Sequence, residues 1–498
     1  MKINAIPVPE RPARRSNDSN GVAGRLAHRH DLERYGMLVN RGADHSSESI
    51  ALPNAWVLVE RGTKATGAQL PTDLTHTVAD LTLPEHLRAR HVIIMGKSGS
   101  GKTTSLILPW LVQSIKRNDG LIVCLSAKGD LTRPVREACR RAGAKLFYIS
   151  PTEPDVTLKW NPIAELRDAG DAEALATMLA DVVRQGENET EYFRAEAIAL
   201  LTPIINACRR GPSRCGLGEI SDGCRTALEL QKLAKDLSLN DVLEFASAAA
   251  GSSNHRTTLS TMLGYTRGFA AKDVRRCVSA ADIRLSELGD SPAVLLVHIP
   301  EHESERLMPF TTILIASLIN SLYRKASSSP SGRLPVECTL VLDEFASALG
   351  RLDLASRINT LRSRNIRVVA AVQTIGQIVE RYRGMHHTLL AGFGTRIAVP
   401  PLTIDDAEIL SRESGLMVQV TASQMGGERI IREEERPLLS PGDLMTAPTH
   451  PERGQPTVWF TPGTPPFYAY LKPLYLWPEW KEFMRAIYGD GTVDEPDP

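Results

Sequence analysis

The chain has 498 residues, 42% apolar and 23% charged, and its 58 Lys and Arg equal its 58 Asp and Glu. These are ordinary values for a globular protein of two to four domains, and the zero net charge predicts nothing about nucleic acid. No apolar run approaches the roughly 20 residues of a membrane span, and residues 1–30 lack a signal peptide's apolar core. These features exclude a membrane-spanning or secreted chain and predict a cytoplasmic protein.

Seven cysteines are scattered along the chain without a C-x-x-C pair, at positions 124, 139, 208, 215, 224, 277 and 338. An odd count without such pairs is typical of proteins from a reducing compartment. The pattern therefore argues against a disulfide framework and against a zinc site built from cysteines.

The N-terminal region gives weak structural signals. Residues 1–25 are rich in Pro, Arg, Ser and Asn, which favours a mobile arm, and the basic stretch 25–41 predicts a short helix. We group residues 1–49 as a basic N-terminal arm with this helix. Residues 50–85 show weak strand signals separated by Gly and Pro.

Strands and helices alternate from residue 91 onward. "VIIM" is a buried strand, a helix is expected from 103 to 116, and "GLIVCLS" is the second strand. A helix that ends at Gly143 and the strand "KLFYIS" follow. This alternation predicts an α/β fold with a mostly parallel sheet flanked by helices.

The alternation stops between residues 164 and 288, where the patterns are helical, and we interpret this range as an inserted all-α domain. Strand patterns return at 293–300, 338–345, 366–374 and 394–400. The nucleotide-binding domain would then consist of residues 50–163 and 289–475, and the acidic end, 476–498, would be a loose tail.

The loop after the first strand fits the pattern G-x-x-x-x-G-K-[ST] at Gly96, Gly101, Lys102 and Thr103. Its glycines let backbone N–H groups wrap phosphate oxygens, its Lys reaches the β- and γ-phosphates, and its Thr binds Mg²⁺. A chance turn is the alternative, but the strand before and the helix after favour a P-loop. The expected nucleotide-binding residues are Gly96, Lys97, Ser98, Gly99, Ser100, Gly101, Lys102, Thr103 and Thr104.

A second acidic element follows the strand in "CTLVLDEF". Asp343 lies at the carboxyl end of this strand, where open α/β sheets place their ligands, and would complete the Mg²⁺ site. Glu344 would orient and deprotonate the attacking water. An ordinary acidic strand-to-loop junction is the alternative.

Two further features admit two interpretations each. Gln373 ends the apolar run "VVAAVQ" and would contact the γ-phosphate or the water, or would merely cap the strand. Residues 350–367 contain five arginines and one acid, which indicates either a solvated helix face or an arginine finger. A finger that acts on a neighbouring subunit implies a ring.

Seven segments in order resemble the TraG/TraD-like coupling ATPases of type IV secretion and bacterial conjugation, over residues 25 to 475. They are "GKSGSGKTTSLILPWLV", "LIVCLSAKGDL", "WNPI", "EYFRAEAIALL", "LDEFASALGRL", "VQTIGQIVERY" and "GTRIAVPPLTIDDAEILSRESG". The resemblance implies a RecA-like fold, ATP and Mg²⁺, and a homohexameric ring whose all-α domain caps the cytoplasmic mouth. It also implies that Arg362 is the arginine finger and Gln373 the family's motif glutamine.

The resemblance further implies partners: single-stranded, relaxase-bound DNA, the relaxase, and components of the secretion channel. Two features depart from the family. This chain has no transmembrane helix, so it would attach to the inner membrane through a partner or work away from it. Ser126 and Ala127 replace the usual D-P before Lys128, which leaves the role of Lys128 open, including that of a simple strand-end lysine.

A DNA pump of this family is therefore the leading hypothesis. The alternatives are a double-stranded DNA translocase or an effector-protein pump of the same superfamily, and a platform that binds nucleotide only to assemble. Intact Lys102, Asp343 and Glu344 argue against the platform.

Overall fold

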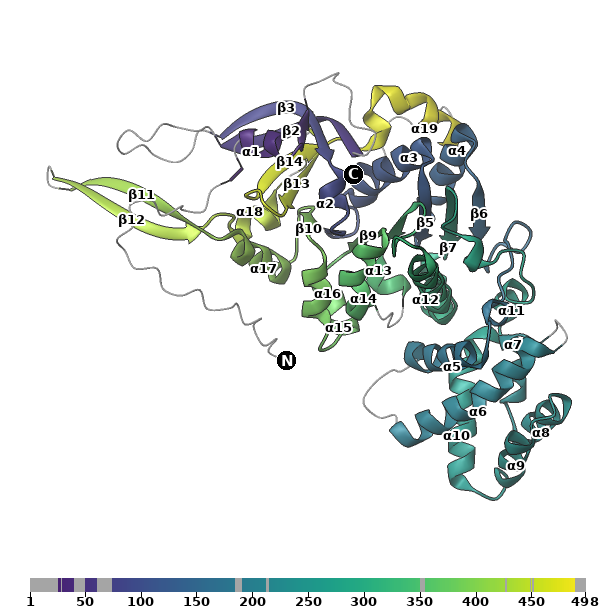
Figure 1. Ribbon diagram of the computed structural model, residues 1–498. Coiled ribbons are helices and arrows are strands. Elements are labelled where there is room, and N and C mark those ends of the chain that lie inside the picture. Colours follow the sequence, from purple (N-terminus) through teal and green to yellow (C-terminus); the bar gives the residue numbers. More distant parts are fainter. Residues whose placement is uncertain are drawn as a thin grey trace.

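The computed structural model describes residues 26–27, 29–39, 50–60, 74–183, 190–211, 215–349, 354–425, 428–447, 449 and 452–488. A twelve-stranded sheet in the order β1-β3-β2-β14-β13-β10-β4-β9-β8-β5-β7-β6 forms its centre, with helices on both faces (Figure 1). The predicted α/β fold, a sheet flanked by helices, is confirmed.

Seven adjacent strands of this sheet run parallel. They are β10 (Thr395–Ala398), β4 (Val92–Met95), β9 (Ile366–Val372), β8 (Glu337–Leu342), β5 (Gly120–Ser126), β7 (Ala293–His298) and β6 (Leu146–Ile149). In β4, Val92 and Ile94 join one apolar core while Ile93 and Met95 join the other. Because both faces are covered, most residues of these strands are apolar.

The other five strands pair antiparallel and extend the sheet beyond β10. They are β1 (Leu38–Val39), β3 (Leu74–Leu83), β2 (Ile50–Glu60), β14 (Phe467–Leu471) and β13 (Gln455–Phe460). Sequence analysis predicts weak strands for 50–85 and none for 455–471. The partners β2 and β14 come from opposite ends of the chain, so no local pattern announces their pairing.

Ala27 and residues 29–39 pack on this antiparallel half, within the stretch 25–41 for which the sequence predicts a short helix. Helix α1 (Arg29–Arg34) is shorter than the predicted 25–41. Leu32 and Met37 are fully buried and join the same apolar core as Val57 and Phe467. Residues 1–25, 28 and 40–49 of the predicted arm lie outside the described part of the chain.

Each face of the sheet has its own set of helices (Figure 1). One face carries α2 (Glu85–Arg88), the π-helical turn η1 (Thr103–Ile107), α3 (Leu108–Arg117), α4 (Thr132–Ala142) and α19 (Lys481–Tyr488). The other carries η5 (Glu301–Glu303), α12 (Ser304–Ser328), α13 (Phe345–Ala348), α14 (Leu354–Leu361), η6 (Arg362–Arg364), α15 (Ile375–Arg381), α16 (His386–Gly392), α17 (Ile404–Ser414) and α18 (Pro441–Thr446).

Helix α19 contradicts the prediction of a loose tail from residue 476. It follows two short 3-10 turns, η7 (Leu474–Leu476) and η8 (Pro478–Trp480). Its Phe483 and Met484 are buried, and the Arg141 guanidinium of α4 lies 5.3 Å from the centre of the Phe483 ring. The aromatic side chains of this region are therefore core contacts for α4. Residues 489–498 lie outside the described part.

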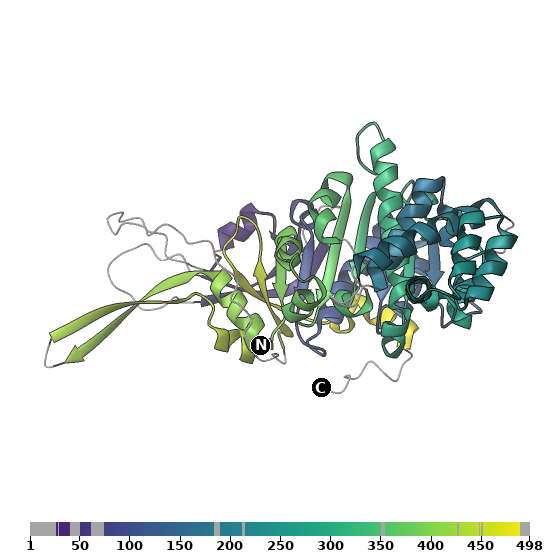
Figure 2. The same cartoon turned by 90° about the horizontal axis from the view of Figure 1, so that it is seen from below.

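Helices between residues 162 and 288 form a layer set apart from the sheet at one end of the molecule (Figures 1 and 2). They are η2 (Pro162–Glu165), α5 (Ala169–Val183), α6 (Glu191–Arg210), α7 (Leu217–Gly223), α8 (Ala227–Asp236), α9 (Asn240–Ala248), α10 (Ser253–Thr266), η3 (Arg267–Phe269), α11 (Lys272–Cys277) and η4 (Leu285–Glu287). The Arg324 guanidinium of α12 contacts the Asp171 carboxylate of α5 at 2.8 Å, which ties this layer to the sheet domain.

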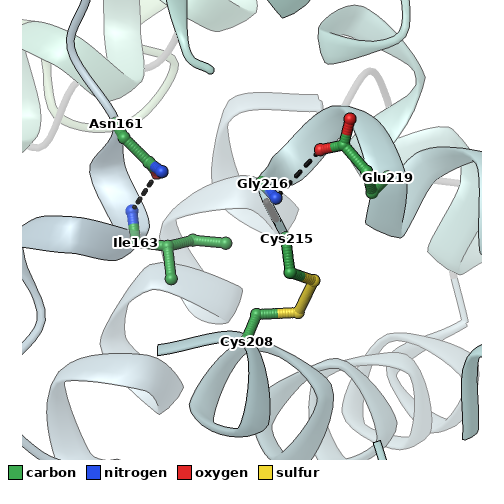
Figure 3. Close-up of a disulfide and its surroundings, with 6 residues drawn as sticks. All are labelled: Asn161, Ile163, Cys208, Cys215, Gly216 and Glu219. Carbon is green, nitrogen blue, oxygen red and sulfur yellow. Dashed lines mark hydrogen bonds between the residues drawn. A yellow bond between two sulfur atoms is a disulfide. The ribbon is translucent and has the colours of Figure 1, made fainter. Parts of the chain in front are cut away.

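Within this layer the structure pairs Cys208 with Cys215 in a disulfide that the cysteine pattern does not predict (Figure 3). Cys208 lies in the last turn of α6, which ends at Arg210, and Cys215 lies two residues before the start of α7 at Leu217. Their Cα atoms are 5.2 Å apart. That separation is normal for a disulfide. The remaining five cysteines are free and buried.

A long β-ribbon, β11 (Leu416–Met425) with β12 (Glu428–Pro437), projects from the end of the molecule opposite the helical layer (Figures 1 and 2). No pattern in the sequence predicts this ribbon. None of the helices in the described residues combines the length and apolarity that crossing a bilayer requires.

Candidate functional site

The candidate site lies at the carboxyl edge of four adjacent parallel strands. Gly96 follows β4, Gln373 follows β9 and Asp343 follows β8, and Lys128 is the second residue after β5. Strand order, which the sequence does not state, therefore decides that these side chains are neighbours. This is the edge at which open α/β sheets bind ligands.

The loop 96–102 requires glycine at three positions. A Cβ atom on Gly96 would lie 2.6 Å from the Val399 carbonyl oxygen, so a larger residue would push β4 away from β10. Gly99 and Gly101 have φ values of 78° and 82°, which disfavour residues with a side chain. The loop is thus shaped by its glycines into a turn with closely approachable backbone N–H groups, which suits phosphate oxygens.

Lys102 is 5% exposed and lies across this loop. Its ammonium donates to the carbonyl oxygens of Gly96 at 2.5 Å and of Lys97 at 2.9 Å. Burial lowers the pKa of this ammonium, and the nearby Glu344 carboxylate partly opposes that shift. The cation is therefore held at the start of the loop, beside the acidic residues of β8.

Asp343 is 2% exposed, and burial, followed by repulsion from Glu344, raises its pKa to about 6. Its Oδ2 atom is buried without a hydrogen-bond partner among the described residues. A buried carboxylate oxygen of this kind is costly unless a cation or donor satisfies it.

These residues fit Mg²⁺. No group of three or more His, Cys, Asp or Glu side chains able to hold a metal occurs in the part of the chain that the structure describes. Mg²⁺ usually takes only one or two protein oxygens and completes its shell with water and substrate phosphates. Asp343 and the hydroxyl of Thr103, which follows Lys102, would supply such a partial shell.

Glu344 is held from several sides. Its backbone is left-handed, with φ 50° and ψ 43°, an uncommon conformation for a residue with a side chain. Its Oε1 lies 3.0 Å from the Lys128 ammonium, and its Oε2 accepts from the Gln373 amide at 3.1 Å. Strained residues of this kind cluster at functional sites, at a cost of about 1–3 kcal/mol.

Lys128 also donates to the Ser98 hydroxyl at 3.2 Å and so joins the P-loop to Glu344. Sequence analysis left the role of this residue open. The K-G-D segment that contains Lys128 was the one sequence feature that pointed to this residue. Its contacts were not predictable because Ser98 and Glu344 follow two other strands. A second residue that sequence analysis missed is Gln455 of β13, which packs against Gly101 and donates to the Pro400 carbonyl oxygen at 2.9 Å.

Arg362 lies away from this site. It is exposed in the η6 turn, before the first residue of β9, whereas Gln373 follows the last. Between them lies β9, whose seven residues at about 3.3 Å each span roughly 23 Å. The charge of Arg362 also acts on His91, which precedes β4. Arg362 is therefore at the amino ends of the parallel strands, whereas its own P-loop is at their carboxyl ends. Residues 350–353 of the arginine-rich segment lie outside the described part.

The comparison with protein families decides the family. Residues 74–476 match the model described as "Type IV secretory system Conjugative DNA transfer". The chain belongs to this family. A comparison with the sequences of curated proteins found no match.

Solved structures with the same fold include those of conjugative coupling proteins. The unbound monoclinic form of the bacterial conjugative coupling protein TrwBdeltaN70 has a TM-score of 0.60 and 19% identity, over 79% of this chain and 87% of that chain. The plasmid coupling protein TrwB in complex with ADP and Mg²⁺ has a TM-score of 0.58 and 19% identity, over 87% and 96%. TrwB with the ATP analogue ADPNP has a TM-score of 0.57 and 20% identity, also over 87% and 96%.

Proposed function

We propose that this member of the conjugative DNA transfer family is an ATP-driven motor. It would recruit single-stranded, relaxase-bound DNA and pump it toward a type IV secretion channel. The observation that carries the proposal is the convergence of Lys102, Asp343, Glu344 and Gln373 at one edge of the sheet. TrwB structures with ADP, Mg²⁺ and ADPNP support it, because they share this fold.

In this mechanism residues 96–104 wrap the triphosphate, and Lys102 exchanges its two loop carbonyls for phosphate oxygens. Thr103 and Asp343 would hold Mg²⁺, which would neutralise phosphate charge when bound. A water attacks the γ-phosphorus while the bond to the bridging oxygen breaks, and Glu344 takes the water's proton. Gln373, already bonded to Glu344, keeps that carboxylate and the water in line.

We extend the proposal to a homohexameric ring in which Arg362 serves a neighbouring subunit. Its position at the opposite edge of the sheet from its own P-loop supports action between subunits. A head-to-tail contact would bring one subunit's Arg362 to the next subunit's γ-phosphate, and such contacts close into rings. The ring would dock on the cytoplasmic face of the inner membrane through a partner protein.

The test is ATP turnover by the full chain with no DNA, single-stranded DNA or duplex DNA. Single-stranded DNA should stimulate the wild type most, and Glu344→Gln should abolish turnover while it retains ATP binding. Stronger stimulation by duplex DNA would replace the proposed substrate with double-stranded DNA. A wild type without turnover under every DNA condition would overturn the motor in favour of a nucleotide-gated platform.

A further inference from the structure

Lys128 contacts both Glu344 and the P-loop, two parts of the site that have different roles in the proposed hydrolysis. Its ammonium lies 3.0 Å from Glu344 Oε1 and 3.2 Å from Ser98 Oγ. The Lys128 side chain is 19% exposed and that of Glu344 is 5% exposed, so the ion pair is well shielded from water. A pair in such a site is much stronger than one on the surface.

Glu344 cannot act as a base while both of its oxygens are engaged in this way. Oε1 pairs with the Lys128 ammonium, and Oε2 accepts from the Gln373 amide. The pair with Lys128 therefore opposes the proton transfer that hydrolysis requires.

The position of Ser98 indicates what could draw Lys128 away. The Lys102 ammonium, which reaches the β- and γ-phosphates in P-loops, lies on the carbonyl oxygens of Gly96 and Lys97. The γ-phosphate of a bound nucleotide would thus lie at this beginning of the loop, next to Ser98. Lys128 already contacts Ser98, so a short side-chain movement suffices to bring its ammonium onto that phosphate.

Charge favours this exchange. Two cations, Lys102 and Lys128, face the carboxylates of Asp343 and Glu344, and Asp130 and Glu301 add negative charge nearby. A γ-phosphate adds further negative charge beside Ser98, and a phosphate competes well for an ammonium. ADP has no γ-phosphate and would leave the pair of Lys128 and Glu344 intact.

We propose that Lys128 is a positioning residue that holds Glu344 in an unproductive ion pair and moves to the γ-phosphate when ATP binds. This movement releases Glu344 Oε1 to accept the proton of the attacking water. The inference rests on the proposed ATPase function and adds a sensor that distinguishes ATP from ADP. It also assigns a role to the lysine of the K-G-D segment.

The first test compares affinities for a non-hydrolysable ATP analogue and for ADP, both with Mg²⁺, in the full chain. Lys128→Met should weaken binding of the analogue at least 10-fold and change ADP binding less than 3-fold. Lys128→Arg keeps the charge and should retain most of the preference for the analogue. Lys232→Met, at an exposed position of α8, is the matched control and should change neither affinity.

A double-mutant cycle tests the pair itself. Glu344→Gln removes the carboxylate that holds Lys128, so it should tighten binding of the analogue several-fold when Lys128 is present. In the Lys128→Met background the same substitution should tighten binding clearly less. An equal effect in both backgrounds, or equal losses of analogue and ADP affinity in Lys128→Met, would overturn the inference.

These readouts are independent of turnover. A wild type that hydrolyses no ATP overturns the proposed motor, whereas the affinity ratios still decide whether Lys128 senses the γ-phosphate. Should Lys128→Met fail to fold, Lys128→Gln, which keeps a polar side chain of similar length, serves in both tests with the same expected results.

Discussion

Protonation of His91 should break the hydrogen bonds that connect the start of β4, the strand before the P-loop, to β9 and to α14, the helix before Arg362. His91 precedes β4 and is 2% exposed. Its Nδ1 accepts from the Val368 N–H of β9 at 3.0 Å, so Nε2 carries the proton and donates to the Ile358 carbonyl oxygen of α14 at 2.8 Å. A second proton would place an N–H against the Val368 N–H and break this arrangement.

The magnitude follows from the pKa of this imidazole. Burial is the main reason that the pKa of His91 is lowered from 6.5 to about 4, and the charges of Arg362 and Arg367 add to the shift. The hydrogen bond to the Ile358 carbonyl oxygen opposes it. At about 1.4 kcal/mol per pKa unit, this shift corresponds to about 3 kcal/mol of stability. Between pH 6.5 and pH 4, His91 binds more protons in the unfolded chain than in the folded one. The contribution is therefore complete above pH 6.5 and is lost as the pH falls toward 4.

The assay is unfolding in urea at several pH values between 7 and 4, for the wild type and for His91→Asn. Asn does not titrate in this range and tolerates the left-handed backbone of residue 91, with φ 62°. The rate of amide hydrogen exchange in peptides from β4 and β9 would show whether the sheet domain that contains His91 is the part that unfolds. The wild type should lose about 3 kcal/mol more than the variant on acidification. Parallel pH profiles for the two proteins would refute the reasoning.

Three further predictions concern the proposed motor and the C-terminal helix. Lys102→Ala should weaken nucleotide binding roughly 10- to 100-fold in a titration, because a charged hydrogen-bonding group contributes about 1.5–3 kcal/mol. Arg362→Ala should lower DNA-stimulated turnover roughly 10³-fold, and mixing it with Lys102→Ala subunits should restore some activity; no recovery would exclude action between subunits. Phe483→Ala should cost about 3 kcal/mol and expose residues 481–488 to hydrogen exchange, whereas exposed Lys481→Ala should not.

Much of the site was predictable because its signals are local. The strand "VIIM", the glycine loop 96–104 and Asp343 with Glu344 are each contained in a few consecutive residues. Backbone conformation and phosphate-binding chemistry depend on those residues themselves, so their patterns persist in the sequence. The helices between 164 and 288 were predictable for the same reason, since amphipathic periodicity is a property of a single segment.

Other features depend on contacts between distant segments. Cys208 in the last turn of α6 pairs with Cys215 just before α7, and Phe483 is buried against α4. The antiparallel half of the sheet joins strands from opposite ends of the chain. No pattern within one segment encodes such partners, so the sequence predicted neither the disulfide nor the packed helix α19.

By itself, the sequence determined that this protein has buried parallel strands, a phosphate-binding loop and an acidic pair at a strand end. Only the tertiary structure decided that Lys128 pairs with Glu344 and that Arg362 lies at the far edge of the sheet. The physical reason is that strand order sets which loops meet at the carboxyl edge. That order results from packing of the whole sheet and its two helical faces, which no short stretch of residues contains.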